Sequence, residues 1–262
     1  FWPQAGIVIG SLVVLVGLSV NSSLRRHRRA TLLMSGLSLL ILAGLFIGYP
    51  YLTQFDQGLI ALVQEHRDPA LDKIMVMVTQ IGEFRAMFIL SAVLTLLLLA
   101  LRQWRQAAFA GATLLCTALA NTGSKWFFAR VRPEVLSEPL TSFSMPSGHS
   151  SGSFALFLTL AVLAGRGQPP RMRLTWLLLG CLPAAAIALS RVYLGAHWPT
   201  DILAGAMLAA CVCAASLTLS QWQGPLKPMP ARAWWLLLPV MLLMCGYMAT
   251  RHLPHALLRY AY

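Results

Sequence analysis

The chain has 262 residues, of which 58% are hydrophobic and 11% are charged. Soluble domains are about 45–50% apolar and about 25% charged, so this composition excludes an ordinary soluble globule, a disordered chain and a secreted disulfide scaffold. The net charge of +12 would indicate a nucleic-acid partner in a soluble chain. Here the basic residues lie mostly in short turns between apolar runs, where they set orientation. The sequence therefore predicts a membrane protein with no nucleic-acid partner.

Eight apolar runs are long enough, or nearly so, to cross a bilayer as helices, which takes about 20 residues each. They predict an all-α fold, a polytopic transmembrane helical bundle. The arginines that follow the first run, rather than precede it, favour a retained span over a signal peptide. In chain order the runs are Ala5–Val20, Leu32–Tyr49, Ala86–Leu101, Ala107–Phe128, Ser150–Gly165, Leu174–Leu189, Ile202–Leu219 and Ala233–Met248.

Lys and Arg are concentrated in alternate short loops, which places those loops on the cytoplasmic side. All eight acidic residues fall in the other loops or at their edges, so the outer side carries the acidic groups and both termini. The longest outer connection is Pro50–Arg85. Its apolar residues recur at helical spacing and predict interfacial helices, which we expect to act as a lid or packing element.

The first polar stretch follows the fourth run and extends from Lys125 to Pro133. Seven residues at about 100° each return Lys125 and Arg132 to one helical face, roughly 10 Å apart. Pro133 disfavours helix at Arg132, so this arginine is expected at the helix end. Two such cations can converge on one anion. The same pattern also fits cationic side chains that snorkel to the interface beside aromatic residues.

The second stretch is Pro146-Ser147-Gly148-His149-Ser150, at the start of the fifth run. Ser147 is a good N-cap, and Gly148 lets a ligand approach the backbone. Free amides at a helix N-terminus form an anion site, beside which His149 could donate a proton. The alternative is a capped helix start with a chance histidine.

The third stretch runs from Ser190 to Asp201 and contains Arg191 and His197. Because His197 and Asp201 are four residues apart, the carboxylate can accept the proton of one imidazole nitrogen and leave the other as a nucleophile. The alternative is a structural ion pair that holds a short loop.

In this topology the three stretches share the outer face of the membrane. Together they supply cations, a helix N-terminus, two imidazoles and an orienting carboxylate, which is the inventory that phosphoryl transfer needs. No carboxylate cluster suited to two divalent metals is visible in the sequence, so we expect no metal and no cofactor.

These stretches resemble the signature of the type-2 phosphatidic-acid phosphatase superfamily, which includes membrane lipid phosphatases and soluble vanadium haloperoxidases. The family pattern is Lys, six residues, Arg-Pro; then Pro-Ser-Gly-His; then Ser-Arg, five residues, His, three residues, Asp, and every position is matched. The resemblance implies a six-helix lipid-phosphatase core over residues 31–220. Residues 1–30 would then add an N-terminal span with a basic cytoplasmic loop, and residues 221–262 a C-terminal span. Some bacterial members follow a DedA-type membrane domain, so a chain that begins with Phe1 is expected to be part of a longer protein.

The resemblance implies that His197 attacks phosphorus and becomes a phosphohistidine, that Asp201 holds its other nitrogen, and that His149 protonates the leaving oxygen. It also implies a set of groups that hold the phosphate: Lys125, Arg132, Ser147, Gly148 and Arg191. For the remaining polar residues nearby, Arg130, Glu134 and Glu138, we expect surface roles.

We therefore expect a metal-independent lipid phosphatase in a bacterial inner membrane, with its site facing the periplasm. The expected substrate is undecaprenyl diphosphate; phosphatidylglycerol phosphate and phosphatidate are alternatives. Two further alternatives are a phosphotransferase that passes the phosphoryl group to a second lipid, and a transporter. A transporter predicts ionisable residues near mid-span, whereas here they cluster at helix ends. The oligomeric state is not predicted.

Overall fold

The computed structural model describes residues 25–136, 140–251 and 253–260. The first predicted run, Ala5–Val20, lies outside these residues. Every other predicted run falls in a helix to within one residue at its ends. The helices are α2 (Arg25–Gly48), the short 3-10 helix η1 (Tyr49–Leu52), α3 (Thr53–Glu65), α4 (Pro69–Ile81), α5 (Phe84–Ala100), α6 (Trp104–Phe128), α7 (Gly148–Ala164), α8 (Pro170–Tyr193), α9 (Pro199–Ser220), α10 (Ala231–Thr250) and α11 (Leu253–Arg259).

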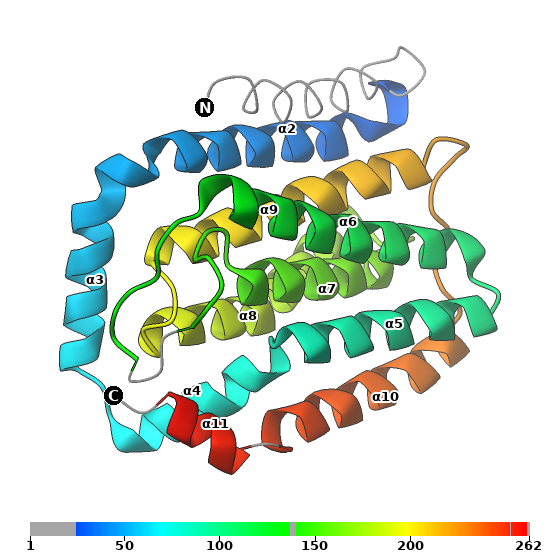
Figure 1. Ribbon diagram of the computed structural model, residues 1–262. Coiled ribbons are helices and arrows are strands. Elements are labelled where there is room, and N and C mark those ends of the chain that lie inside the picture. Colours follow the sequence, from blue (N-terminus) through cyan, green and yellow to red (C-terminus); the bar gives the residue numbers. More distant parts are fainter. Residues whose placement is uncertain (1–24, 137–139, 252, 261–262) are drawn as a thin grey trace.

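The long helices lie side by side along one common direction, and successive helices alternate in sense (Figure 1). Helix α7 contacts α5, α6, α8 and α9, so it forms the centre of the bundle. The main core is apolar and includes Leu94 of α5, Phe109 of α6 and Leu156 of α7, all fully buried. This packing explains why α7 is apolar around its whole circumference.

Four helical segments of the described chain are long and apolar enough to cross a membrane: Ala30–Glu65, α8, α9 and α10. The pair α4 and α5, bent by 49°, would make a fifth. Eight spans were predicted, and the difference has two causes within the described residues. Helix α7 has only 17 residues, and α6 carries polar residues such as Thr113 and Asn121, which are buried inside the bundle.

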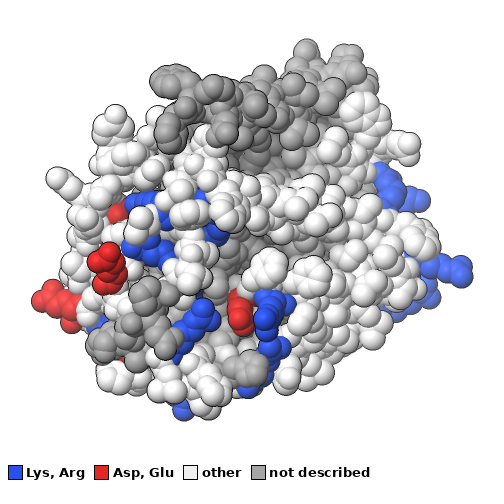
Figure 2. Space-filling model, viewed as in Figure 1, with Lys and Arg blue, Asp and Glu red and all other residues white. Residues whose placement is uncertain are grey.

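One end of the bundle, where α6 and α8 finish and α7 and α9 begin, is called the polar end below. The connection Pro50–Arg85 lies there and forms α3 and α4, which confirms the predicted helices. Asp68 caps α4 by accepting from the amides of Ala70 and Leu71, with Pro69 in the first turn. On the face that Figure 2 shows, acidic side chains gather towards the polar end, whereas Lys and Arg lie at both ends.

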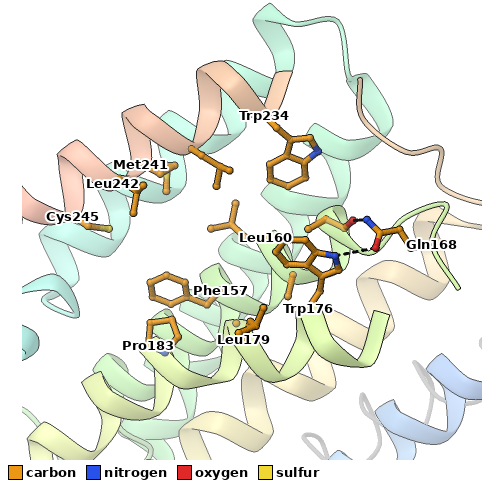
Figure 3. Close-up of a pocket in the computed structure, with 14 residues that line it drawn as sticks. Phe157, Leu160, Gln168, Trp176, Leu179, Pro183, Trp234, Met241, Leu242 and Cys245 are labelled. Carbon is orange, nitrogen blue, oxygen red and sulfur yellow. Dashed lines mark hydrogen bonds between the residues drawn. The ribbon is translucent and has the colours of Figure 1, made fainter. Parts of the chain in front are cut away.

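An apolar groove of about 480 Å³ lies between α7, α8 and α10, away from the polar end (Figure 3). Phe157, Leu179 and Met241 are among its lining residues. Two side-chain hydrogen bonds join lining residues: Trp176 Nε1 donates to Gln168 Oε1, and Gln168 Nε2 donates to the carbonyl of Ala164, each at 3.1 Å. None of the residues predicted to bind phosphate lines it.

Candidate active site

Backbone turns bring the three predicted stretches together at the polar end. Helix α6 stops at Ala129, which adopts a left-handed conformation with φ of 46°. Gly195, with φ of 68°, turns the chain between α8 and α9. A Cβ at Gly195 would lie 2.7 Å from Val135 Cβ. This position therefore needs glycine for two reasons, its backbone conformation and the close approach of the α6–α7 connection.

His197 and Asp201 form the predicted pair. His197 Nδ1 lies 3.4 Å from Asp201 Oδ2, and both residues are buried. The same carboxylate oxygen accepts from the hydroxyl of Ser144 and, at 3.0 Å, from the amide of Trp198. The imidazole therefore faces a carboxylate whose position is set by two other donors.

Arg132 lies on the opposite side of the imidazole. Its Nη1 is 2.9 Å from His197 Nε2 and also donates to the carbonyl of Ala196 at 2.6 Å. Its Nε donates to the carbonyl of Ser142 at 2.7 Å. Lys125, in the last turn of α6, donates from Nζ to the carbonyl of Phe143. Two predicted phosphate ligands are thus anchored by one connection, from α6 to α7.

Arg191 is the third predicted cation and is only 2% exposed. Its Nη1 donates to Thr79 Oγ1 at 3.0 Å and to Tyr260 Oη at 2.6 Å. Its Nε is buried and has no hydrogen-bond partner among the described residues. A buried guanidinium with an unpaired donor edge is the environment expected of an anion-binding arginine.

Burial and the positive charges of the site lower the pKa of His197. Burial holds the pKa of its imidazole well below the ordinary value, and the positive charges of Arg132 and Arg191 lower it further. Lys125 and His149 act on it in the same direction. Burial and the charge of Arg191 also lower the pKa of Arg132 to about 10. Such crowding of cations would be relieved by a bound anion.

The start of α7 completes the arrangement. Ser147 Oγ accepts from the amide of Ser150 at 3.4 Å, as predicted for an N-cap. The amide of Ser147 donates to the carbonyl of Asp201 at 3.0 Å, which ties α7 to α9. Gly205 of α9 allows this contact, because a Cβ there would lie 2.7 Å from the carbonyl oxygen of Ser147. Gly82 abuts His149, whose Cδ2 would lie 3.0 Å from an added Cβ.

These residues fall in a sequence region with known relatives. A family model described as the PAP2 superfamily matches residues 106–225. This part of the chain is similar to the PAP2 superfamily. The match contains every predicted catalytic and phosphate-binding residue.

An undecaprenyl-diphosphatase of Sulfolobus acidocaldarius is 29% identical over 184 residues, which are 66% of this chain and 82% of that protein. Phosphatidylglycerophosphatase B of Bacillus subtilis is 34% identical over 93 residues, 33% of this chain and 44% of that protein.

Two crystal structures share the fold. A PAP2-type phosphatidylglycerolphosphate phosphatase from Bacillus subtilis has a TM-score of 0.61 at 22% identity, covering 68% of this chain and 91% of its own. Aquifex aeolicus LpxE has a TM-score of 0.50 at 23% identity, and the match covers 62% of this chain and 93% of the LpxE chain. Because both structures are less than 25% identical to this chain, their similarity shows the fold alone.

The prediction of a surface role for Arg130 is wrong. Arg130 is buried between two carboxylates: Nη1 donates to Asp201 Oδ1 and Nη2 to Asp56 Oδ2, each at 2.7 Å. Asp56 also accepts from the backbone amide of Thr200 at 3.1 Å. Glu134 is exposed, as predicted, and Glu138 lies outside the described residues.

Asp56 could have been found from helical spacing. It is four residues before Ile60, and the two lie on the same, buried face of α3. An acidic residue on the apolar face of an amphipathic helix needs a cationic partner, and that signal points to Arg130. In the described part of the chain, no group of three or more His, Cys, Asp or Glu could hold a metal.

Proposed function

We propose that this protein is a membrane lipid phosphatase that hydrolyses a lipid phosphate or diphosphate at the polar end of its bundle, through a phosphohistidine on His197. Three observations support this class: the match of residues 106–225 to the PAP2 superfamily, the relatives named as phosphatases, and the helices that are long and apolar enough to cross a membrane. A transporter is disfavoured because the ionisable residues cluster at helix ends.

The hydrogen bonds around His197 carry the proposal. A guanidinium can only donate, so the contact from Arg132 Nη1 makes His197 Nε2 the unprotonated nitrogen of the ring. The proton of the neutral imidazole must then be on Nδ1, which faces Asp201 Oδ2. This is the tautomer that an Nε2 nucleophile requires. The lone pair of Nε2 would become free for attack when Arg132 turns to the oxygens of a bound phosphate. The lowered pKa keeps the imidazole neutral.

Two displacements follow. In the first, His197 Nε2 forms a bond to phosphorus while the bond from phosphorus to the leaving oxygen breaks, and His149 gives its proton to that oxygen. In the second, His149 takes a proton from water, the water oxygen attacks phosphorus, and the phosphorus–nitrogen bond breaks to release phosphate. His149 ends the cycle protonated, as it began. Burial and the charges of Arg191, Arg132 and Lys125 lower the pKa of His149, so this step requires that the negative charge of the bound phosphate raises that pKa again.

The oxygens of the transferring group would be held by Lys125, Arg132, Arg191, the hydroxyl of Ser147 and the amide of Gly148. Arg191 can present the unpaired Nε. Each such donor is worth about 2.7–4 kcal/mol in the transition state, judged from oxyanion-hole mutations. We propose that these protein cations take the part that divalent metals play in other phosphoryl-transfer enzymes.

We propose undecaprenyl diphosphate as the substrate, with phosphatidylglycerol phosphate and phosphatidate as the alternatives. Support comes from the relative named undecaprenyl-diphosphatase, which matches a larger share of this chain than phosphatidylglycerophosphatase B does. We further propose a bacterial inner membrane with the site facing the periplasm. The opposite end of the bundle carries basic loop residues such as Arg102 and Arg171, as the cytoplasmic side does.

The test is phosphate release by detergent-purified protein from a panel of lipid phosphates and diphosphates, compared by kcat/KM. His197→Ala should abolish turnover without unfolding the protein, and His66→Ala should not, because His66 is exposed and bonds its own helix. Substantial activity in His197→Ala would contradict the nucleophile. Thin-layer analysis with labelled donor separates the alternative reaction, since a new phospholipid without free phosphate would identify a phosphotransferase.

A further inference from the structure

Tyr260 brings a C-terminal segment into the site. It directly follows α11 and lies outside the part of the chain that the PAP2 family matches. Helix α11 packs against α4 at the polar end (Figure 1). The side chain of Tyr260 is buried in an apolar cluster with Val76 of α4 and with Leu194 and Ala196 of the α8–α9 connection. This cluster borders the loop that carries His197.

The phenol of Tyr260 meets the most buried cation of the site. Its Oη accepts from Arg191 Nη1 at 2.6 Å, and its ring centroid lies 5.3 Å from the guanidinium carbon. Thr79 accepts from the same nitrogen. Both hydrogens of Nη1 are thereby used, and the guanidinium can turn only its other edge, Nε and Nη2, towards a ligand.

The backbone of Tyr260 is held as well. Its carbonyl accepts from Arg67 Nη2 at 3.2 Å, and Arg67 is in turn paired with Asp72 of α4 at 3.1 Å. The residue is therefore fixed at its backbone, its ring and its hydroxyl. A side chain held at three places can restrict the guanidinium that it contacts.

We propose that Tyr260 is a positioning residue for phosphate binding: it orients Arg191 so that the Nε edge faces the phosphate. This inference rests on the proposed function of the site. It also gives the C-terminal segment a part in the reaction, although that segment lies outside the family match.

The test is Tyr260→Phe in the full chain, which keeps the ring and its packing and removes only the hydroxyl. A hydrogen bond to a charged group contributes about 1.5–3 kcal/mol, so kcat/KM should fall by about tenfold or more. The affinity for orthovanadate, measured by calorimetry, should fall in parallel. Tyr193→Phe is the matched control, because that phenol bonds the backbone of Asp68.

A double-mutant cycle separates positioning from stability. If Tyr260 acts through Arg191, Tyr260→Phe should have no further effect on kcat/KM or vanadate affinity in an Arg191→Ala background. If Tyr260→Phe lowered kcat/KM equally in the wild-type and Arg191→Ala backgrounds, the positioning role would be contradicted. Higher activity of the single Tyr260→Phe variant would contradict it too, because it would mean that the phenol competes with substrate. If the wild type hydrolyses no lipid phosphate, the proposed function fails. The vanadate affinities of the two backgrounds would still decide the role of Tyr260.

Discussion

Replacing Arg130 by methionine should destabilise the protein, because it removes the only charge shown to bridge Asp56 and Asp201. Both carboxylates are 0% exposed and Arg130 is 8% exposed, with each contact at 2.7 Å. Breaking a buried ion pair in this way costs about 3–5 kcal/mol, because the remaining charges are left uncompensated. For a chain of 150–250 residues, 1 kcal/mol shifts Tm by about 2–4 °C. We therefore expect a fall in Tm of about 6–20 °C.

The assay is thermal unfolding in detergent, followed by circular dichroism. Arg85→Met is the control, since Arg85 is an exposed arginine at the same end of the bundle, and it should shift Tm by little. Adding Asp56→Asn to Arg130→Met removes one uncompensated charge and should restore part of the loss. A Tm for Arg130→Met equal to that of wild type would refute the reasoning, because it would mean that the carboxylates need no counter-charge.

Three further outcomes are expected. First, kcat/KM should not fall as the pH is lowered through 6.5, because the lowered pKa of His197 keeps its imidazole unprotonated there. After correction for the ionisation of the substrate, a loss of kcat/KM at or above pH 6.5 would contradict His197 as the nucleophile. Second, Gly205→Ala should lower stability by about 1–3 kcal/mol through overpacking against the Ser147 carbonyl, whereas Gly246→Ala, with nothing within 4 Å, should be neutral or stabilising in the same unfolding assay. Third, EDTA should leave phosphate release unchanged, and restoration of a lost activity by Mg²⁺ or Zn²⁺ would contradict a metal-free mechanism.

The sequence predicted the parts of the site that depend on local spacing. His197 and Asp201 are four residues apart at the start of a helix, and Ser147 caps another, so both geometries follow from helix periodicity. The prediction that Lys125 and Arg132 share one helical face is wrong, because α6 ends at Phe128 and Arg132 lies in the connection that follows. Hydropathy placed every run of the described chain inside a helix, apart from one residue at an end, although helices such as α2 and α8 extend several residues beyond their runs.

Contacts between distant segments could not be predicted in this way. Arg130 and Asp56 are 74 residues apart, and their pairing depends on how α3 crosses the end of the bundle. Tyr260 meets Arg191 only because α11 turns back onto α4. The burial of the polar residues of α6 could not be predicted from hydropathy either, because only the packed structure shows that Thr113 and Asn121 face the interior.

The carboxylate of Asp201 receives four contacts, from Arg130, Ser144, the Trp198 amide and His197. With both oxygens engaged, the carboxylate is held in one orientation relative to the imidazole. In the proposed mechanism, its negative charge would balance the positive charge that develops on the phosphorylated imidazole of His197. The proposed mechanism assigns proton transfer in both half-reactions to His149. Replacing His149 by a group of different basicity should therefore slow formation and breakdown of the intermediate together.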